Sequence, residues 1–178
     1  MIARFSNISV EPLTEHETPR IENMPPVIGC FISDKDGKTL LSFEIFEGAL
    51  EMFLKKENYN GFKESFDLEL IPMFISAFER FSEQLNFKDL SGLDLLGTGL
   101  KMYSFFCFEK FTVTFFLSPW ISINKHSERV VAFFDRFFDS NRDLFENFYL
   151  KCTTEKIKQL NLVGNRWLNQ LNSSLAFH

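Results

Sequence analysis

Residues 103–117, YSFFCFEKFTVTFFL, contain two pairs of adjacent aromatic residues: Phe105 with Phe106, and Phe115 with Phe116. Successive side chains of a β-strand point to opposite faces of its sheet. A sheet with one wet face would expose one member of each pair to water. The stretch therefore predicts two strands in the middle of a sheet that helices cover on both faces.

The chain upstream predicts a β-hairpin. Residues 27–33, VIGCFIS, are an apolar run, and turn residues follow at 34–37, DKDG. The next run, residues 39–46, alternates Leu41, Phe43 and Ile45 with polar side chains. This alternation is typical of an edge strand with one dry and one wetter side, so the first strand should lie deeper in the sheet.

An amphipathic helix is expected to cross from the hairpin to the next strands. Its apolar residues recur at spacings of three and four, and we expect this stripe to cover one face of the sheet: Leu70, Phe74, Phe78, Phe81 and Leu85. The polar residues fall mostly on the opposite side, which we expect to face solvent: Glu69, Ser76, Glu79, Arg80 and Glu83.

Three strand-like segments then follow with short connections, so they should form an antiparallel meander. Ser127 is a plausible N-cap for a helix, and further helices are expected from near Arg142 and near Thr154. The predicted fold class is α+β. It has a five-stranded mixed, mostly antiparallel sheet (hairpin, crossover helix, three-strand meander) sandwiched between helices.

The 178 residues suffice for one well-packed domain. Residues 1–26 contain four prolines and are expected to form an extended leader. Residues 27–150 should form the domain, and residues 151–178 a C-terminal helical extension that packs on it. Because Gly164 interrupts this weakly amphipathic extension, a detachable helix offered to a partner is the alternative.

The bulk composition narrows the classes of partner. The net charge is −5 and the lysines are scattered, which argues against nucleic acid as a partner. No apolar segment approaches the roughly 20 residues that span a bilayer. We expect a soluble cytoplasmic protein, and we read Cys30, Cys107 and Cys152 as buried free thiols.

Motifs for catalysis, cofactors or metals are absent from the sequence. Gly97-Thr98-Gly99 lacks the third glycine of a dinucleotide-binding loop, since Met102 stands at that position. The three histidines are far apart in the chain and show no metal-ligand spacing. We therefore predict no enzyme activity, no cofactor and no metal site.

The order of elements resembles the longin and roadblock superfamily over about residues 27–149. Three short features carry this resemblance: the turn Ser33-Asp34-Lys35-Asp36-Gly37, the tract GTGLKMYSFF that leads into FTVTFFLSP, and the helix after the fifth strand. The leader and the C-terminal extension depart from the minimal roadblock pattern and favour a longin-type relative.

The resemblance implies a non-enzymatic adaptor or regulatory module. Such domains bind small Ras-like GTPases or other longin/roadblock-type subunits, in trafficking or GTPase-regulating complexes, and many pair through sheet edges or the crossover helix. A homodimer or heterodimer thus stays open, and the leader and the C-terminal extension argue against simple roadblock-type homodimerisation. We predict partner contacts at Ser76, Glu79, Arg80 and Glu83 on the outer face of the crossover helix, and at Trp120 on a loop.

Two alternatives stay open from the residues alone. Trp120 either caps the core or anchors a partner or the surface of a membrane, which leaves peripheral membrane association open. The many phenylalanines also fit a small-molecule sensor with an apolar core pocket.

Overall fold

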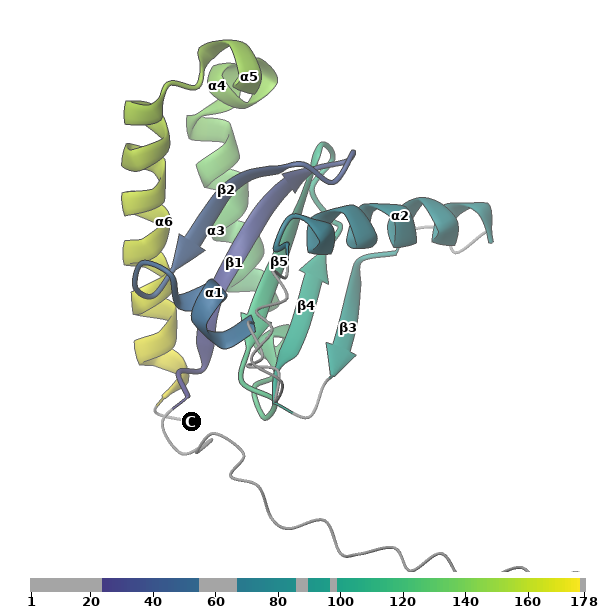
Figure 1. Ribbon diagram of the computed structural model, residues 1–178, viewed down its shortest axis with the longest axis vertical. Helices are drawn as coiled ribbons and strands as arrows, with labels where there is room; N and C mark the ends of the chain where they lie inside the picture. Colours follow the sequence, from purple (N-terminus) through teal and green to yellow (C-terminus); the bar gives the residue numbers. More distant parts are fainter. Residues whose placement is uncertain (1–23, 55–66, 86–89, 97–98, 177–178) are drawn as a thin grey trace, which may run out of the picture.

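A computed structural model describes residues 24–54, 67–85, 90–96 and 99–176 (Figure 1). Most of the predicted leader, the polar connection at residues 55–66 and the Gly97-Thr98 dipeptide lie outside the described residues.

The five strands form one sheet in the order β2-β1-β5-β4-β3. The strands are β1 (Val27–Asp34), β2 (Thr39–Glu44), β3 (Gly92–Leu96), β4 (Lys101–Phe105) and β5 (Phe111–Leu117). The hairpin and the meander are confirmed, and β5 joins them by pairing with β1. Every pair is antiparallel, so the predicted "mixed" character of the sheet is wrong.

The β1–β2 turn (residues 34–38) owes its shape to two residues. The Asp34 carboxylate accepts hydrogen bonds from the backbone N–H groups of Asp36 and Lys38, at 3.0 and 2.9 Å. Gly37 has φ +82°, a conformation that side chains with a Cβ rarely adopt. A Cβ at Gly37 would also meet the backbone of Met73, so the turn approaches the crossover helix closely.

Helices cover both faces of the sheet (Figure 1). On one face lie α1 (Ala49–Leu54) and α2 (Leu70–Gln84). The other side holds the 3-10 helix η2 (Ile123–His126), α3 (Ser127–Ser140), α4 (Arg142–Glu146), α5 (Phe148–Lys151) and α6 (Thr154–Leu175). Phe105, Phe106, Phe115 and Phe116 are all buried, as the opening stretch predicts.

Aromatic rings fill the core between the sheet and α3 and α6. The Phe134 ring lies against Phe115 and Trp167, with ring centroids 6.1 and 5.4 Å away, and Trp167 stacks on Phe133 at 4.0 Å. A second, smaller cluster beneath α1 contains Phe31 and Phe116. The phenylalanine excess therefore serves packing on both faces.

The C-terminal helix α6 lies against β2 and β1 and does not project from the domain (Figure 1). Its glycine is the point of closest approach, because a Cβ at Gly164 would clash with the Phe43 ring. Two asparagines add polar contacts. The Asn165 Oδ1 accepts a hydrogen bond from the Glu44 N–H, and the Asn172 amide bonds both the N–H and the C=O of Val27.

Two local expectations need correction, and one helix was not expected. Ser127 is the first residue of α3 and not its N-cap, because η2 runs directly into the helix. Helix α1, which the sequence pattern did not predict, buries Ala49 and Leu50 against β1. Cys107 is exposed in the β4–β5 connection, so only Cys30 is a fully buried thiol and Cys152 is half-buried.

Candidate interaction surface

Helix α2 lies on the sheet with its polar side inward, the reverse of the expectation. Ser76 and Ser82 are buried, whereas Phe74 and Phe81 are 56% and 55% exposed. The prediction that the apolar stripe covers the sheet is wrong for Leu70, Phe74, Phe81 and Leu85. Phe78 is half-buried, and Ile75, beside the stripe, is fully buried, so the inward side of α2 also carries apolar residues. We call the exposed residues of this face the α2 stripe: Leu70, Met73, Phe74, Phe81 and Leu85.

The sheet beneath α2 explains this orientation, because it presents hydroxyl groups. Ser33, Ser104, Thr112 and Thr114 are all buried. The strand register aligns Ser33 with Thr112 and Ser104 with Thr114, and the latter two hydroxyls lie 2.9 Å apart. Buried hydroxyls need polar partners. Ser33 donates to the Thr112 carbonyl and Ser104 pairs with Thr114 within the sheet, whereas the Thr112 hydroxyl donates to Glu79 of α2. The polar side of α2 therefore faces this row of sheet hydroxyls.

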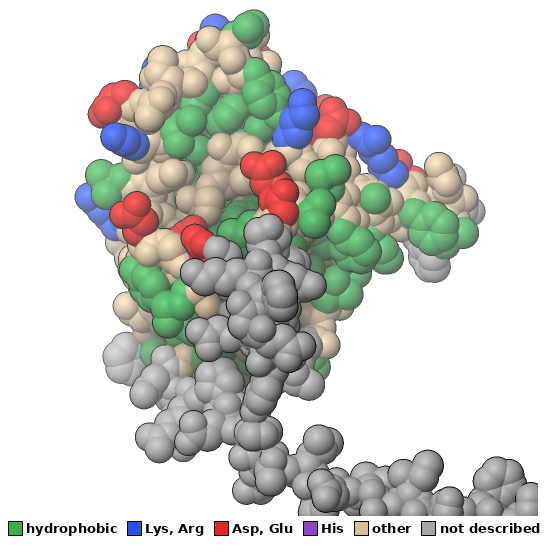
Figure 2. Space-filling view, viewed as in Figure 1, with side chains coloured by type: hydrophobic (Ala, Val, Ile, Leu, Met, Phe, Trp, Pro, Cys, Tyr) green, Lys and Arg blue, Asp and Glu red, His purple; other side chains and the backbone are tan. Residues whose placement is uncertain are grey.

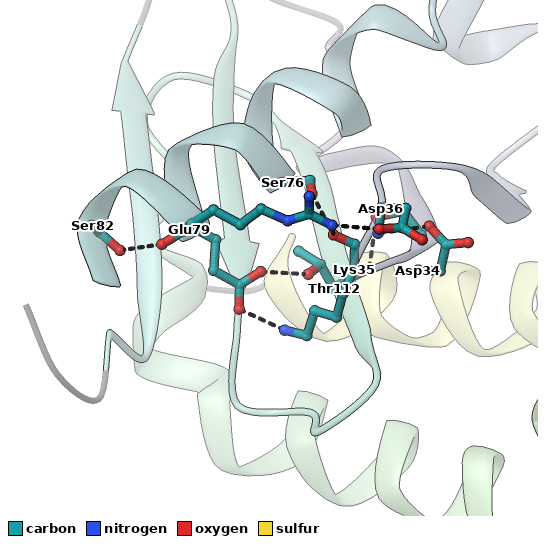
Figure 3. A network of polar contacts seen from close by, with 9 residues as sticks. Asp34, Lys35, Asp36, Ser76, Glu79, Ser82 and Thr112 are labelled. Carbon is teal, nitrogen blue, oxygen red and sulfur yellow. Dashed lines mark hydrogen bonds and ion pairs between the residues drawn. The ribbon is translucent and has the colours of Figure 1, made fainter. Parts of the chain in front are cut away.

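A polar network fastens α2 to the β1–β2 turn (Figure 3). The Lys35 Nζ donates to Glu79 Oε1 at 2.6 Å, and the Thr112 hydroxyl donates to Glu79 Oε2 at 3.4 Å. The Lys35 carbonyl accepts hydrogen bonds from the Ser76 hydroxyl and from Arg80, which also pairs with Asp36. The same residues that hold the helix thus set which of its faces meets solvent.

The five predicted contact residues divide into two groups. Ser76 and Glu79 point toward the sheet, so their predicted place on the outer face is wrong. Arg80, Glu83 and Trp120 are exposed. Arg80 and Glu83 line a shallow hollow beside α2, together with Phe106, Phe108 and Glu109. Trp120 lies apart from α2, on the connection between β5 and η2.

Sequence reasoning missed the α2 stripe as a surface because it assigned those residues to the core. The space-filling view shows hydrophobic side chains along α2 on this face of the molecule (Figure 2). The sequence of the strands contains the information that predicts the orientation of α2. Thr112 and Thr114 are two residues apart, so their hydroxyls share one face of β5 and mark that face as polar.

The neighbouring edge strand β3 is open. Among the described residues, β3 pairs with β4 alone and no strand lies beyond it. Leu95 and Leu96 of this strand are exposed. Within the described ranges, the β3 backbone groups that face away from β4 thus have no strand partner, and such groups can pair with another strand.

The described residues show little that could support covalent or metal chemistry. Burial raises the pKa of the Cys30 thiol, and partial burial raises that of Cys107, so both thiols are poor nucleophiles at neutral pH. Within the described ranges, no three His, Cys, Asp or Glu side chains gather to hold a metal ion. No helix in that part of the chain combines the length and apolarity that crossing a membrane requires.

The hairpin, the crossover helix and the meander occur in the order that the sequence resemblance implied, and they form one sheet with helices on both faces. No family profile matches this chain, and no curated protein matches it either.

Two solved structures have a similar arrangement over 58% of this chain and 71% of theirs. MglB with a tetrameric arrangement is 11% identical, with a TM-score of 0.41. The gliding protein MglB from Thermus thermophilus is 12% identical, with a TM-score of 0.39.

Proposed function

We propose that this chain is a non-enzymatic longin-like adaptor or regulatory module. It would bind a small Ras-like GTPase or another longin/roadblock-type subunit through the α2 stripe and β3. The proposal rests on the orientation of α2, whose apolar side faces solvent. This orientation leaves the five large apolar side chains of the α2 stripe exposed. Contiguous exposed apolar residues on a soluble domain are characteristic of binding surfaces.

The two parts of this surface suit two kinds of contact. The α2 stripe offers anchors at helical spacing for an apolar groove or a second helix, and the open β3 edge offers backbone groups to a partner strand. Arg80 and Glu83 flank the stripe and would form part of a polar rim. A partner that covers both elements would bury apolar area without further chemistry.

The non-enzymatic part of the proposal stays a prediction from the sequence, and the surface supports it only by offering apolar anchors and rim charges for binding. The sensor alternative gains no support from the core, because aromatic rings occupy the space around Phe134.

The first experiment identifies the partner. The purified chain is used as bait in host lysate, with GDP and with a non-hydrolysable GTP analogue, and captured proteins are identified by mass spectrometry. A GTPase enriched in one nucleotide state supports the GTPase form of the proposal. A longin-type subunit captured equally in both states supports the subunit form, and capture of neither contradicts the proposal.

The second experiment locates the interface on the captured partner. We expect Phe74→Glu and Phe81→Glu to weaken binding at least tenfold, since loss of a central anchor commonly costs about 2 kcal/mol or more. Leu162→Glu on α6 is the matched control, because Leu162 is similarly exposed but lies on a different helix. Equal affinity for all variants would exclude the α2 stripe as the interface.

A third set of variants tests the contacts predicted from sequence. Alanine at Arg80, Glu83 and Trp120, singly and together, is expected to give smaller losses for the two α2 residues, because rim charges contribute little. An unchanged affinity for the triple variant would remove these residues from the interface.

A further inference from the structure

The two edge strands of the sheet, β2 and β3, differ in whether another element of the described chain lies beside them. The edge strand β3 is open among the described residues, whereas α6 runs beside β2 (Figure 1). An open edge invites pairing with another chain, and proteins cover edges that must stay single.

At β2, a side chain of α6 occupies an edge hydrogen-bonding group. The Ile45 N–H donates to Ile28 of β1, so the alternation of an antiparallel pair directs the Glu44 N–H away from β1. This outward N–H is bound by Asn165 Oδ1 at 2.9 Å. A strand that pairs with β2 at Glu44 would have to displace this amide.

Asn172 extends the closure beyond the end of β2. Val27 lies past the last residue pair between β1 and β2, which joins Gly29 to Glu44. The Asn172 amide takes up the Val27 N–H at 2.7 Å and the Val27 C=O at 2.8 Å. The side chain thus makes the two backbone contacts that a neighbouring strand residue would make.

At β3, by contrast, the side chains favour the approach of another strand. Phe106 N–H donates to Ser91, so the backbone groups of Gly92, Asp94 and Leu96 face outward. Charged side chains commonly protect such an edge. The one charge here, Asp94, is paired with Lys101 at 3.0 Å.

We propose that α6 is an edge guard that makes this module one-sided, so that an edge strand from a partner sheet adds at β3 alone. The proposal rests on the proposed function for the use of β3, and it adds that the second edge is closed by Asn165 and Asn172. An assembly formed this way ends after one partner, because the opposite edge of each module cannot extend it.

The test compares two double variants of α6. Asn165→Ala with Asn172→Ala removes the three hydrogen bonds to the sheet backbone. Asn169→Ala with Ser173→Ala is the matched control, because these side chains bond only to carbonyls of α6 itself. The molar mass of each variant is followed by light scattering over a wide concentration range, after circular dichroism has established that it is folded.

We expect the first variant to grow with concentration well beyond the wild-type mass, and the control to keep that mass. The same result is expected in a Phe74→Glu background, because association through β2 does not involve the α2 stripe. If the proposed function fails and β3 takes no partner strand, the first variant should stop at pairs joined through β2, which still exceed the mass of the control. A folded Asn165/Asn172 variant that keeps the wild-type mass at all concentrations would overturn the edge guard.

Hydrogen exchange of the wild-type protein tests the same point without any variant. The amides of Glu44 and Val27 should exchange at least about tenfold more slowly than the amide of Asp94, because only the first two are bound by α6. Exchange at Glu44 as fast as at Asp94 would also overturn the proposal, even if the double variant failed to fold.

Discussion

Helices α2 and α6 are both amphipathic and both lie on the sheet, yet they turn opposite sides to it. Helix α6 buries Leu160, Trp167, Leu168 and Leu171 against apolar strands. Helix α2 turns Ser76, Glu79 and Ser82 toward the sheet beside the buried Ile75, and it leaves Phe74 and Phe81 exposed. Periodicity shows that a helix has an apolar side, but the chemistry of the opposing sheet face decides where that side points.

The largest change in stability is expected for a substitution where α6 packs against the sheet. Leu168→Ala should lower the free energy of unfolding by about 2–5 kcal/mol, because Leu168 is fully buried and its truncation leaves a cavity. Chemical denaturation followed by circular dichroism measures the change. A loss below that range would mean that α6 packs more loosely on the sheet than its buried residues indicate.

Gly164→Ala tests the closest approach of α6 to the sheet. A methyl group would meet the Phe43 ring, so we expect a loss of about 1–3 kcal/mol, despite the higher helix propensity of alanine. Thermal unfolding of this variant, with the outward-facing Val163→Ala as control, provides the measurement. A gain in stability would show that α6 shifts to accommodate the methyl group.

The corresponding test for α2 removes the carboxylate that binds the helix to the sheet and to the β1–β2 turn. Glu79→Ala leaves the Lys35 ammonium and the Thr112 hydroxyl without their shared carboxylate, and we expect a loss of about 1–3 kcal/mol. Glu83→Ala, on the exposed side of the same helix, should change stability little. Equal effects for the two glutamates would contradict the inward polar side of α2.

Tyr149 provides a pH-dependent contact between α5 and the β1–β2 turn. Partial burial, and then its 2.7 Å hydrogen bond to Asp34, raise the pKa of Tyr149 from 10.0 to about 12. The neutral phenol is favoured in the folded state, so its stabilising contribution is present below pH 10.0 and is lost as the pH rises toward about 12. Ultraviolet titration of the wild type and of Tyr149→Phe should differ by one tyrosine that ionises near pH 12. A difference centred near pH 10.0 would contradict the contact.

The smallest effect is expected in the α2 stripe. Phe74→Ala should change the free energy of unfolding by no more than about 0.5 kcal/mol, because the side chain is largely exposed in the isolated domain. Denaturation alongside Leu168→Ala gives the contrast directly. A loss as large as that of Leu168 would mean that Phe74 belongs to the core after all.

The sequence predicted the sheet well because its signals are local. The adjacent pairs at Phe105 and Phe115 required cover on both faces, and the turn after Asp34 fixed the hairpin. The orientation of α2 could not be predicted from its own residues, since it depends on hydroxyls of three strands that converge only in the folded chain. Glu79 and Ser76 were assigned to the wrong side of the helix for this reason.

The hydroxyl row beneath α2 also affects how this domain opens. Detaching α2 from the sheet would hydrate serines, threonines and a carboxylate, with Pro72 and Ile75 as the buried apolar residues of the helix, so it should carry a small heat-capacity change compared with global unfolding. Helix α2 should therefore open as a separate cooperative unit, at a lower free energy than α3 and α6. The element that carries the proposed binding surface is then also the one that the domain releases most readily.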